Sequence, residues 1–224
     1  MTTTSDISAA RVAVADASRS LAEAGLLVGT AGNVSMRVGE LAAVTATGAV
    51  LGELTPEQVT IVTLDGEVVE GDWAPTSETA LHLGVLRHAP ADQVGAVVHT
   101  HAPMATSLSL VLDEVPVVHY QQLLLGGALR VAPFHPFGSV ELAHAVGAAL
   151  DGRLAALMAN HGAVALGRDL VHAVENALLT EWICDLYWHA RAIGQPRALD
   201  AAAQHAVVEA ATRRGYGQPQ RAGR

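Results

Sequence analysis

The first apolar residues of the chain recur at helical spacing. Four of them fall three or four positions apart and therefore share one face of a helix that we predict over residues 8–24. They are Ala10, Val14, Ala17 and Leu21. Gly25 follows where a helix C-cap belongs, which supports an end at this point.

From there to residue 69 the pattern changes to the short alternating or apolar runs that are typical of strands. We predict strands near residues 34–38, 41–45, 59–64 and 67–69. Asp65-Gly66 separates the last two, and this dipeptide is a strong signal for a two-residue hairpin.

In the rest of the chain, helices and strands alternate. Ser77 is expected as the N-cap of a helix that ends before Pro90, and Ser139 and Asp169 are expected to begin two further helices. The predicted helices cover residues 77–87, 104–110, 139–150, 169–193 and 199–213, and the predicted strands cover residues 96–101, 115–118, 129–132 and 154–158.

This order of elements predicts an α/β fold. Because helices and strands interleave and hairpins are included, we expect a three-layer α/β/α arrangement with a mixed central sheet covered on both faces. Residues 1–224 are expected to form a single domain, with residues 216–224 as a polar tail that is free or held by a neighbouring subunit.

Charge and hydropathy narrow the classes of partner. The chain has 13 Lys+Arg against 22 Asp+Glu, a formal net charge of −9, so it lacks the basic footprint of a nucleic-acid binder. The first residues do not resemble a signal peptide, and the longest uncharged run, between Asp92 and Asp113, is broken by Pro103. We therefore expect a cytoplasmic protein without membrane contact.

Histidine is far more abundant than cysteine. The single cysteine, Cys184, allows no intrachain disulfide and no structural zinc site built from thiolates, and it is expected to be a small buried hydrophobe. The chain has eleven histidines. Any transition metal must therefore be held by imidazole and carboxylate groups.

Two of these histidines, His99 and His101, stand two positions apart at the end of a predicted strand. Successive strand side chains alternate between faces, so both imidazoles point the same way and could grip a metal. A pair of hydrogen-bonded histidines at a strand end is the alternative. Glu78 at a predicted helix start and His161 after another predicted strand would complete a ligand set suited to catalytic zinc.

Three small polar segments could receive an anion. They are Gly29-Thr-Ala-Gly-Asn-Val-Ser35, Thr45-Ala-Thr-Gly48 and Thr76-Ser77. Backbone N–H groups are accessible in such segments, and a helix N-terminus favours phosphate. Each segment alone could also be an ordinary turn, and neither a Walker loop nor a GxGxxG fingerprint occurs. Because Glu78 directly follows Thr76-Ser77, an anion site here would adjoin the metal site.

The order of these motifs resembles the class II aldolase/adducin family. Six motifs occur in sequence: Gly-Thr-Ala-Gly-Asn-x-Ser, Thr-Gly, Ser-Glu, His-x-His, His-Tyr and His-Gly. The resemblance runs from about Ala10 to the C-terminus. It implies a metal-dependent aldolase of carbohydrate metabolism that reversibly cleaves a phosphorylated (deoxy)ketose, such as L-fuculose 1-phosphate, into dihydroxyacetone phosphate and an aldehyde.

The resemblance also implies roles for individual residues. The metal ligands would be His99, His101, His161 and Glu78, with Glu78 acting as base once substrate displaces it from the metal. The substrate phosphate would be bound by Gly32, Asn33, Thr47, Gly48, Thr76 and Ser77. Tyr120 would handle the proton on the aldehyde oxygen, and Tyr216 would reach the active site of a neighbouring subunit. The implied metal is Zn²⁺, with Mn²⁺ or Co²⁺ not separated by ligand type, and the implied assembly is a homotetramer with active sites at subunit interfaces.

Some features depart from the aldolase pattern or leave alternatives. Thr76 stands where these aldolases usually have serine, and the His135-Pro136 pair is unfamiliar in the loop that shapes the aldehyde end. The epimerase branch usually has Asp at the position of Glu78 and lacks a tyrosine at the position of Tyr120, so this pair favours an aldolase. A dehydratase branch shares the zinc histidines, and an adducin-like scaffold without catalysis would be expected to lose them.

His82 lies one helical turn after Glu78. It is interpreted either as a residue beside the metal site or as a partly exposed helix histidine. Trp182, Tyr187 and Trp188 crowd one stretch of a predicted helix and are expected in the core or at a subunit interface.

Overall fold

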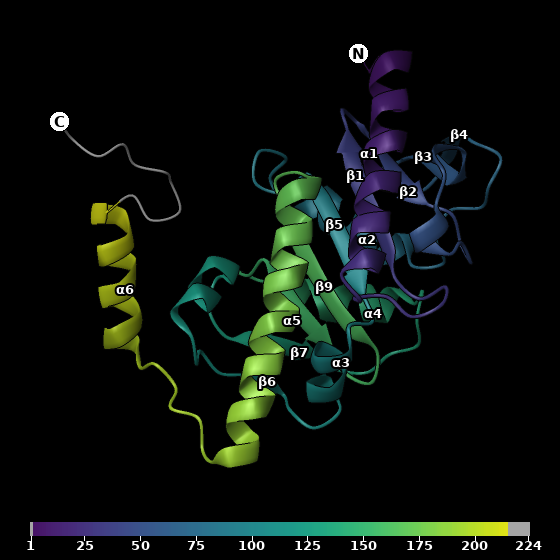
Figure 1. Ribbon diagram of the computed structural model, residues 1–224. Helices are drawn as coiled ribbons and strands as arrows, with labels where there is room; N and C mark the ends of the chain where they lie inside the picture. The colour runs from purple at the N-terminus through teal and green to yellow at the C-terminus, as the bar shows by residue number, and fades with distance from the viewer. Residues whose placement is uncertain (1, 215–224) are drawn as a thin grey trace.

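The computed structural model describes residues 2–214, and within this range nine strands form one sheet in the order β4-β3-β2-β1-β5-β9-β8-β7-β6 (Figure 1). Neighbouring strands are antiparallel except for β7 and β8, so the predicted mixed sheet is confirmed. The strands are β1 (Asn33–Val38), β2 (Leu41–Thr45), β3 (Val59–Thr63), β4 (Val68–Glu70), β5 (Ala96–Thr100), β6 (Glu114–Val115), β7 (Leu129–Ala132), β8 (Ala155–Met158) and β9 (Gly162–Gly167).

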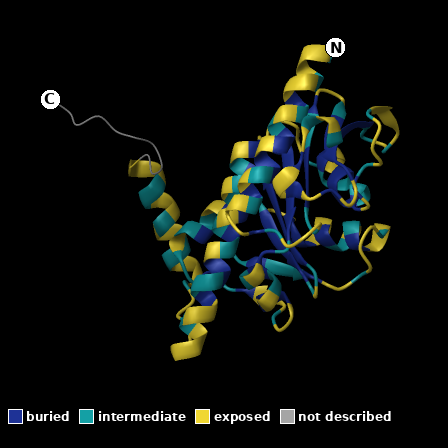
Figure 2. Ribbon diagram, turned by 45° about the vertical axis from the view of Figure 1, so that its right-hand side comes forward, coloured by how far each residue is buried: buried dark blue, intermediate teal, exposed yellow. Residues whose placement is uncertain are grey.

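Helices cover both faces of this sheet. On one face lie α1 (Thr4–Glu23), α3 (Pro103–Ser109) and α5 (Leu170–Ile193), and on the other lie α2 (Thr79–His88) and α4 (Val140–Ala149). Adjacent residues of β5 divide between the two cores, because Val98 packs with the first set of helices and Val97 with the second. Buried residues accordingly fill the middle of the molecule (Figure 2). The three-layer α/β/α expectation is confirmed.

The remaining elements lie outside these layers. Three short 3-10 helices, η1 (Leu51–Glu53), η2 (Pro56–Gln58) and η3 (Tyr120–Leu125), connect longer elements. Helix α6 (Ala201–Arg214) has no buried residue, contacts η3 and stands away from the sheet (Figure 1). Among the described residues, none of the helices combines the length and hydrophobicity needed to cross a bilayer.

Three local predictions were wrong. Strand β9 was not predicted, because a strand buried at every position shows no polar alternation. The turn that joins β8 to β9 passes through Asn160, which takes a left-handed φ of 59°. Helix α2 begins at Thr79 with Glu78 as N-cap, so Ser77 is not the cap. The strand predicted near residues 115–118 shortens to β6, whereas Ser139 and Asp169 cap their helices as expected.

The carboxyl end of β5 is closely approached by a neighbouring backbone. A Cβ added to Gly162 at the start of β9 would lie 2.2 Å from the carbonyl oxygen of Thr100, and on the other side a Cβ on Gly32 would lie 2.9 Å from that of His99. Only glycine permits these approaches without a shift. They set how closely the flanking chains can pack around the last residues of β5.

Replacing Gly162 therefore tests this packing. We expect Gly162→Ala to lower the free energy of unfolding by about 1–3 kcal/mol, because the added methyl forces β9 away from Thr100. Urea denaturation measures the change. Gly84→Ala in α2 is the matched control, since its Cβ would meet nothing within 4 Å, and it is expected to be neutral or stabilising. Equal stability of Gly162→Ala and the parent protein would contradict this account.

Candidate metal centre

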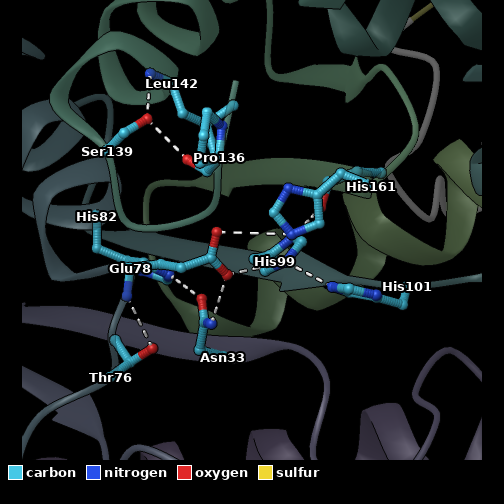
Figure 3. Close-up of polar contacts among 11 residues, drawn as sticks. Asn33, Thr76, Glu78, His82, His99, His101, Pro136, Ser139, Leu142 and His161 are labelled. Atoms are coloured by element: carbon cyan, nitrogen blue, oxygen red, sulfur yellow. Dashed lines mark hydrogen bonds and ion pairs between the residues drawn. The ribbon is translucent and has the colours of Figure 1, made fainter. Parts of the chain in front are cut away.

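Three histidines meet where β5 and the β8–β9 turn end. His99 is in β5, His101 follows the strand, and His161 precedes β9, which pairs with β5. One ligand nitrogen from each ring lies within 4.8 Å of the others, and the Nε2 atoms of His99 and His101 are 3.0 Å apart. Figure 3 shows the three rings converging beside Glu78. The structure thus brings together the three histidines that the sequence analysis singled out.

A backbone contact sets the tautomer of His99. Its Nδ1 lies 2.9 Å from the carbonyl oxygen of Ala163. A carbonyl can only accept, so Nδ1 carries the proton and donates it. The Nε2 atom of neutral His99 therefore keeps its lone pair, and this lone pair faces the centre of the cluster. This is the arrangement that metal-binding histidines adopt.

His101 and His161 are held in the neutral form that binds metals. Burial, followed by the neighbouring histidines, lowers the pKa of His101 to about 4. Burial is likewise the largest cause of the lowered pKa of His161. Both rings are therefore uncharged near neutral pH, and each can offer a lone pair without first losing a proton.

Glu78 adds a carboxylate to the cluster. It is 4% exposed, and its Oε2 lies 3.1 Å from His99 Nε2 and accepts a hydrogen bond of 3.0 Å from Asn33 Nδ2. Its Oε1 lies 3.6 Å from His161 Nε2 and has no hydrogen-bond partner among residues 2–214. Burial by itself would raise the pKa of Glu78, but the contacts with His99, Asn33 and His161 hold the pKa below its usual range, so the group is ionised.

These donors fit a divalent cation. The approach of His99 Nε2 to Glu78 Oε2 at 3.1 Å is favourable when a positive charge, either a proton or a metal ion, lies between the two atoms. The buried Oε1 of Glu78 lacks a hydrogen bond, and a bound cation would satisfy it. Imidazole and carboxylate are ligands that zinc and related metals accept. The geometry therefore favours a metal site over a simple pair of hydrogen-bonded histidines.

Behind Glu78 lies a buried polar chain that includes His82. The side chain of His82 is 0% exposed, and its Nε2 is hydrogen-bonded to Asn33 Oδ1 while its Nδ1 lies 2.7 Å from Ser35 Oγ. Burial lowers the pKa of His82 to about 3. Of the two interpretations of His82, the position beside the metal site is confirmed. Its spacing of one helical turn from Glu78 was the signal in the sequence.

The segments expected to bind phosphate lie next to Glu78. Ala46 forms an antiparallel β-bridge with Pro75. The backbone N–H of Thr76 donates to the carbonyl oxygen of Thr45 at 2.9 Å, and that of Thr47 donates to Ala74 at 3.0 Å, so residues 45–47 and 74–76 run side by side. The hydroxyl oxygen of Thr76 accepts from the N–H of Glu78 at 3.3 Å, which leaves the hydroxyl proton to donate to an anion.

The other two expected phosphate ligands, Gly32 and Asn33, stand at the start of β1 beside β5. The side-chain amide of Asn33 is engaged by Glu78 and His82. The phosphate roles of Gly32, Asn33, Thr47, Gly48, Thr76 and Ser77 stay predictions.

A loop with two exposed phenylalanines borders the same segments. A Cβ on Gly138 would lie 2.7 Å from the carbonyl oxygen of Ser77, so the loop before α4 packs against Ser77. Figure 3 shows its turn from Pro136 to Ser139. Phe134 and Phe137 on this loop are 61% and 71% exposed. The expected role of this loop at the aldehyde end of the substrate stays a prediction.

The two expected catalytic tyrosines have different outcomes. Tyr120 begins η3, is 41% exposed, stacks near His119 with ring centroids 4.5 Å apart, and lines a cavity between η3 and α6. Its expected role with the aldehyde oxygen stays a prediction. Tyr216 lies outside the described residues. Cys184 is buried, as expected, and Tyr187 packs in the core.

Comparison with known proteins places this geometry in context. The chain matches the sequence profile of the Class II Aldolase and Adducin N-terminal domain over residues 12–188. It is 37% identical to the 5-methylthioribulose-1-phosphate/5-deoxyribulose-1-phosphate aldolase of Rhodospirillum rubrum over 202 residues, and these aligned residues cover 90% of each chain. It is 35% identical to the 5-deoxy-D-ribulose 1-phosphate aldolase of Bacillus thuringiensis, over 81% of this chain and 85% of that one.

The fold agrees with the sequence comparison. The structure superposes on that of an L-fuculose 1-phosphate aldolase with a TM-score of 0.87 at 30% identity, covering 94% of this chain and 98% of that chain. The cluster of His99, His101 and His161 fits the divalent metal site of such enzymes. The expectation of a class II aldolase, a carbon–carbon lyase, is confirmed. The chain belongs to the class II aldolase/adducin family.

Proposed function

We propose that this aldolase uses zinc to cleave a phosphorylated deoxyketose reversibly into dihydroxyacetone phosphate and an aldehyde. The observation that carries the proposal is the convergence of three imidazoles on the ionised carboxylate of Glu78, one of whose buried oxygens lacks a hydrogen bond. Thr76 and Ser77 directly precede Glu78, and residues 74–76 pair with residues 45–47, so hydroxyl and amide groups of both segments lie close to this cluster. Retention of all four metal ligands supports an enzyme over an adducin-like scaffold.

The proposed substrate is a short ketose 1-phosphate with a deoxygenated end. The relatives at 37% and 35% identity act by name on 5-deoxyribulose 1-phosphate, and the first also on 5-methylthioribulose 1-phosphate. L-Fuculose 1-phosphate, the substrate in the name of the superposed structure, is the second candidate. The exposed rings of Phe134 and Phe137 support an apolar end, because a methyl or methylthio group would be removed from water against them.

A bound divalent cation supplies Lewis-acid polarisation of the ketose carbonyl and the neighbouring hydroxyl. In the cleavage direction, a proton leaves the hydroxyl on carbon 4, the bond between carbons 3 and 4 breaks, and a proton reaches carbon 3. Glu78 is the carboxylate that would give this proton to carbon 3, and it would remove it in the synthetic direction. Tyr120 is proposed to exchange the proton with the oxygen on carbon 4.

The environment of Glu78 supports its use as a base. The same carboxylate experiences two opposed effects on its pKa, since burial raises it and the contacts with His99, Asn33 and His161 lower it. A substrate that separates Glu78 from His99 and His161 while keeping water out would remove part of the lowering effect. The pKa would then rise toward the value that proton transfer near neutral pH requires.

Phosphate binding is proposed to occur through backbone amides and hydroxyls. Thr47 and Thr76 lie on the paired segments 45–47 and 74–76, and Gly48 and Ser77 directly follow these segments. This kind of site needs no basic patch. Such a site is compatible with the net charge of −9. Holding the phosphate away from the breaking bond contributes positioning to the transition state.

A homotetramer with Tyr216 reaching a neighbouring active site is part of the proposal. Large apolar side chains that are 43–92% exposed on α5 and η3 support an interface there. They are Leu124, Trp182, Trp188 and Ile193.

A substrate panel tests the reaction. We expect the enzyme to release dihydroxyacetone phosphate, which a coupled NADH-dependent assay measures. The value of kcat/KM should be highest for 5-deoxyribulose 1-phosphate or 5-methylthioribulose 1-phosphate and lower for L-fuculose 1-phosphate. Ribulose 5-phosphate, which carries its phosphate at the other end, is the control and should not react. Loss of water from 5-methylthioribulose 1-phosphate without dihydroxyacetone phosphate would instead indicate a dehydratase.

Metal analysis tests the cofactor. Protein produced with ample metal is expected to hold about one zinc ion per chain, and chelation should abolish activity until zinc is restored. His101→Ala should lose most of the bound metal, whereas His172→Ala, which lies at the start of α5, should keep it. Full activity with only trace metal would rule out this cofactor.

Replacing Glu78 tests the base. Glu78→Gln keeps the size of the side chain but cannot take a proton, so we expect kcat to fall by about 10²–10⁴-fold while the protein stays folded by circular dichroism. Glu23→Gln, an exposed change at the end of α1, is the control and should keep the parent rate. Near-normal turnover by Glu78→Gln would exclude the proposed role.

A further inference from the structure

Four buried side chains from two elements form one hydrogen-bonded chain behind the metal centre. Ser35 and Asn33 lie two positions apart on β1, and Glu78 and His82 lie one turn apart at the start of α2. Contacts run from Ser35 to His82, from His82 to Asn33 and from Asn33 to Glu78. Side chains two positions apart share one face of a strand, and side chains four positions apart share one face of a helix. The pair on β1 therefore faces the pair at the start of α2.

The direction of each hydrogen bond follows from the chemistry of its end. An ionised carboxylate only accepts, so Asn33 turns its amide NH₂ toward Glu78 and its Oδ1 toward His82. An amide oxygen also only accepts, so His82 Nε2 carries a proton and donates it. In neutral His82 the Nδ1 atom then accepts from the hydroxyl of Ser35. The chain therefore fixes the rotamer and the amide orientation of Asn33.

The two carboxylate oxygens of Glu78 therefore have different hydrogen-bond partners. Oε2 receives the Asn33 hydrogen bond, whereas Oε1 has no hydrogen-bond partner in the described part of the chain and lies on the side of His161. All four side chains are buried, so water offers no substitute for a missing partner. Without His82, Asn33 Oδ1 would lose its donor, and the amide could rotate away from the carboxylate.

We propose that His82 is a positioning residue that acts through Asn33 to hold the carboxylate of Glu78 with one oxygen turned toward the metal position. The expected effect on catalysis rests on the proposed function, because it requires that Glu78 takes part in the reaction. The expected effect on the position of the Glu78 carboxylate does not. Groups that orient a metal ligand in this way typically contribute 10- to 100-fold in metal affinity or activity.

The test compares two substitutions of His82. His82→Leu removes the donor to Asn33, and we expect zinc affinity, measured by competition with a chromophoric chelator, to fall about 10- to 100-fold. The visible spectrum of the Co²⁺-substituted protein should shift, because the position of the carboxylate changes. kcat should fall by a similar factor with little change in KM, since the segments proposed to hold phosphate are untouched. His82→Gln, which can still donate to Asn33, should recover most of the affinity and the parent spectrum.

The controls separate positioning from folding and from the reaction. His144→Leu on α4 removes a histidine outside the cluster and should change none of these readouts. If His82→Leu does not fold, Asn33→Leu, which removes the hydrogen bonds to both His82 and Glu78, is judged by zinc affinity and the Co²⁺ spectrum alone. Parent zinc affinity and an unchanged Co²⁺ spectrum in the folded variant would overturn the proposal. If the parent protein cleaves no tested ketose but its zinc affinity and spectrum respond to His82→Leu, only the proposed function fails.

Discussion

The close backbone approach at the end of β5 is the constraint on which the metal centre depends. The Gly162 backbone lies against the carbonyl of Thr100, and this contact carries the β8–β9 turn, with His161, to the side of His99. A hydrogen bond from His99 to Ala163, also on β9, then sets the tautomer of the central ligand. One strand pairing therefore determines both the distance between two ligands and the chemical state of one of them.

The electrostatics of the cluster follow from burial on top of this pairing. A buried carboxylate is unfavourable by itself, and Glu78 stays ionised because His99, Asn33 and His161 offset the effect of burial. Burial also keeps His101 and His161 neutral, so the cluster presents lone pairs and one negative charge. An arrangement of this kind is more favourable with a divalent cation at its centre than without one, which couples metal binding to the stability of the fold.

Periodicity predicted those parts of the fold and site that depend on neighbours along the chain. The facing side chains of His99 and His101 follow from the period of two in a strand, and the closeness of His82 to Glu78 follows from one helical turn. The place of His161 depended on β9, which was missed because its apolar run lacks alternation. The bridge from His82 to Glu78 through Asn33 could not be predicted, since it requires the packing of α2 against β1 and the burial of every partner.

The carboxylate of Glu78 could serve both as a metal ligand and as a base only if its electrostatic environment changes while its position changes little. In the present geometry the histidines around Glu78 lower its pKa, and burial opposes them. Substrate oxygens that replace Glu78 at the metal would remove the first influence and keep the second, so basicity would rise where the proton is transferred. The hydrogen bond from Asn33 to Oε2 would then be an advantage, because it would let Oε1 separate from a bound cation without the whole side chain moving into solvent. Loss of the buried link to His82 is therefore expected to change the position of the Glu78 carboxylate more than it changes the stability of the surrounding sheet and helices.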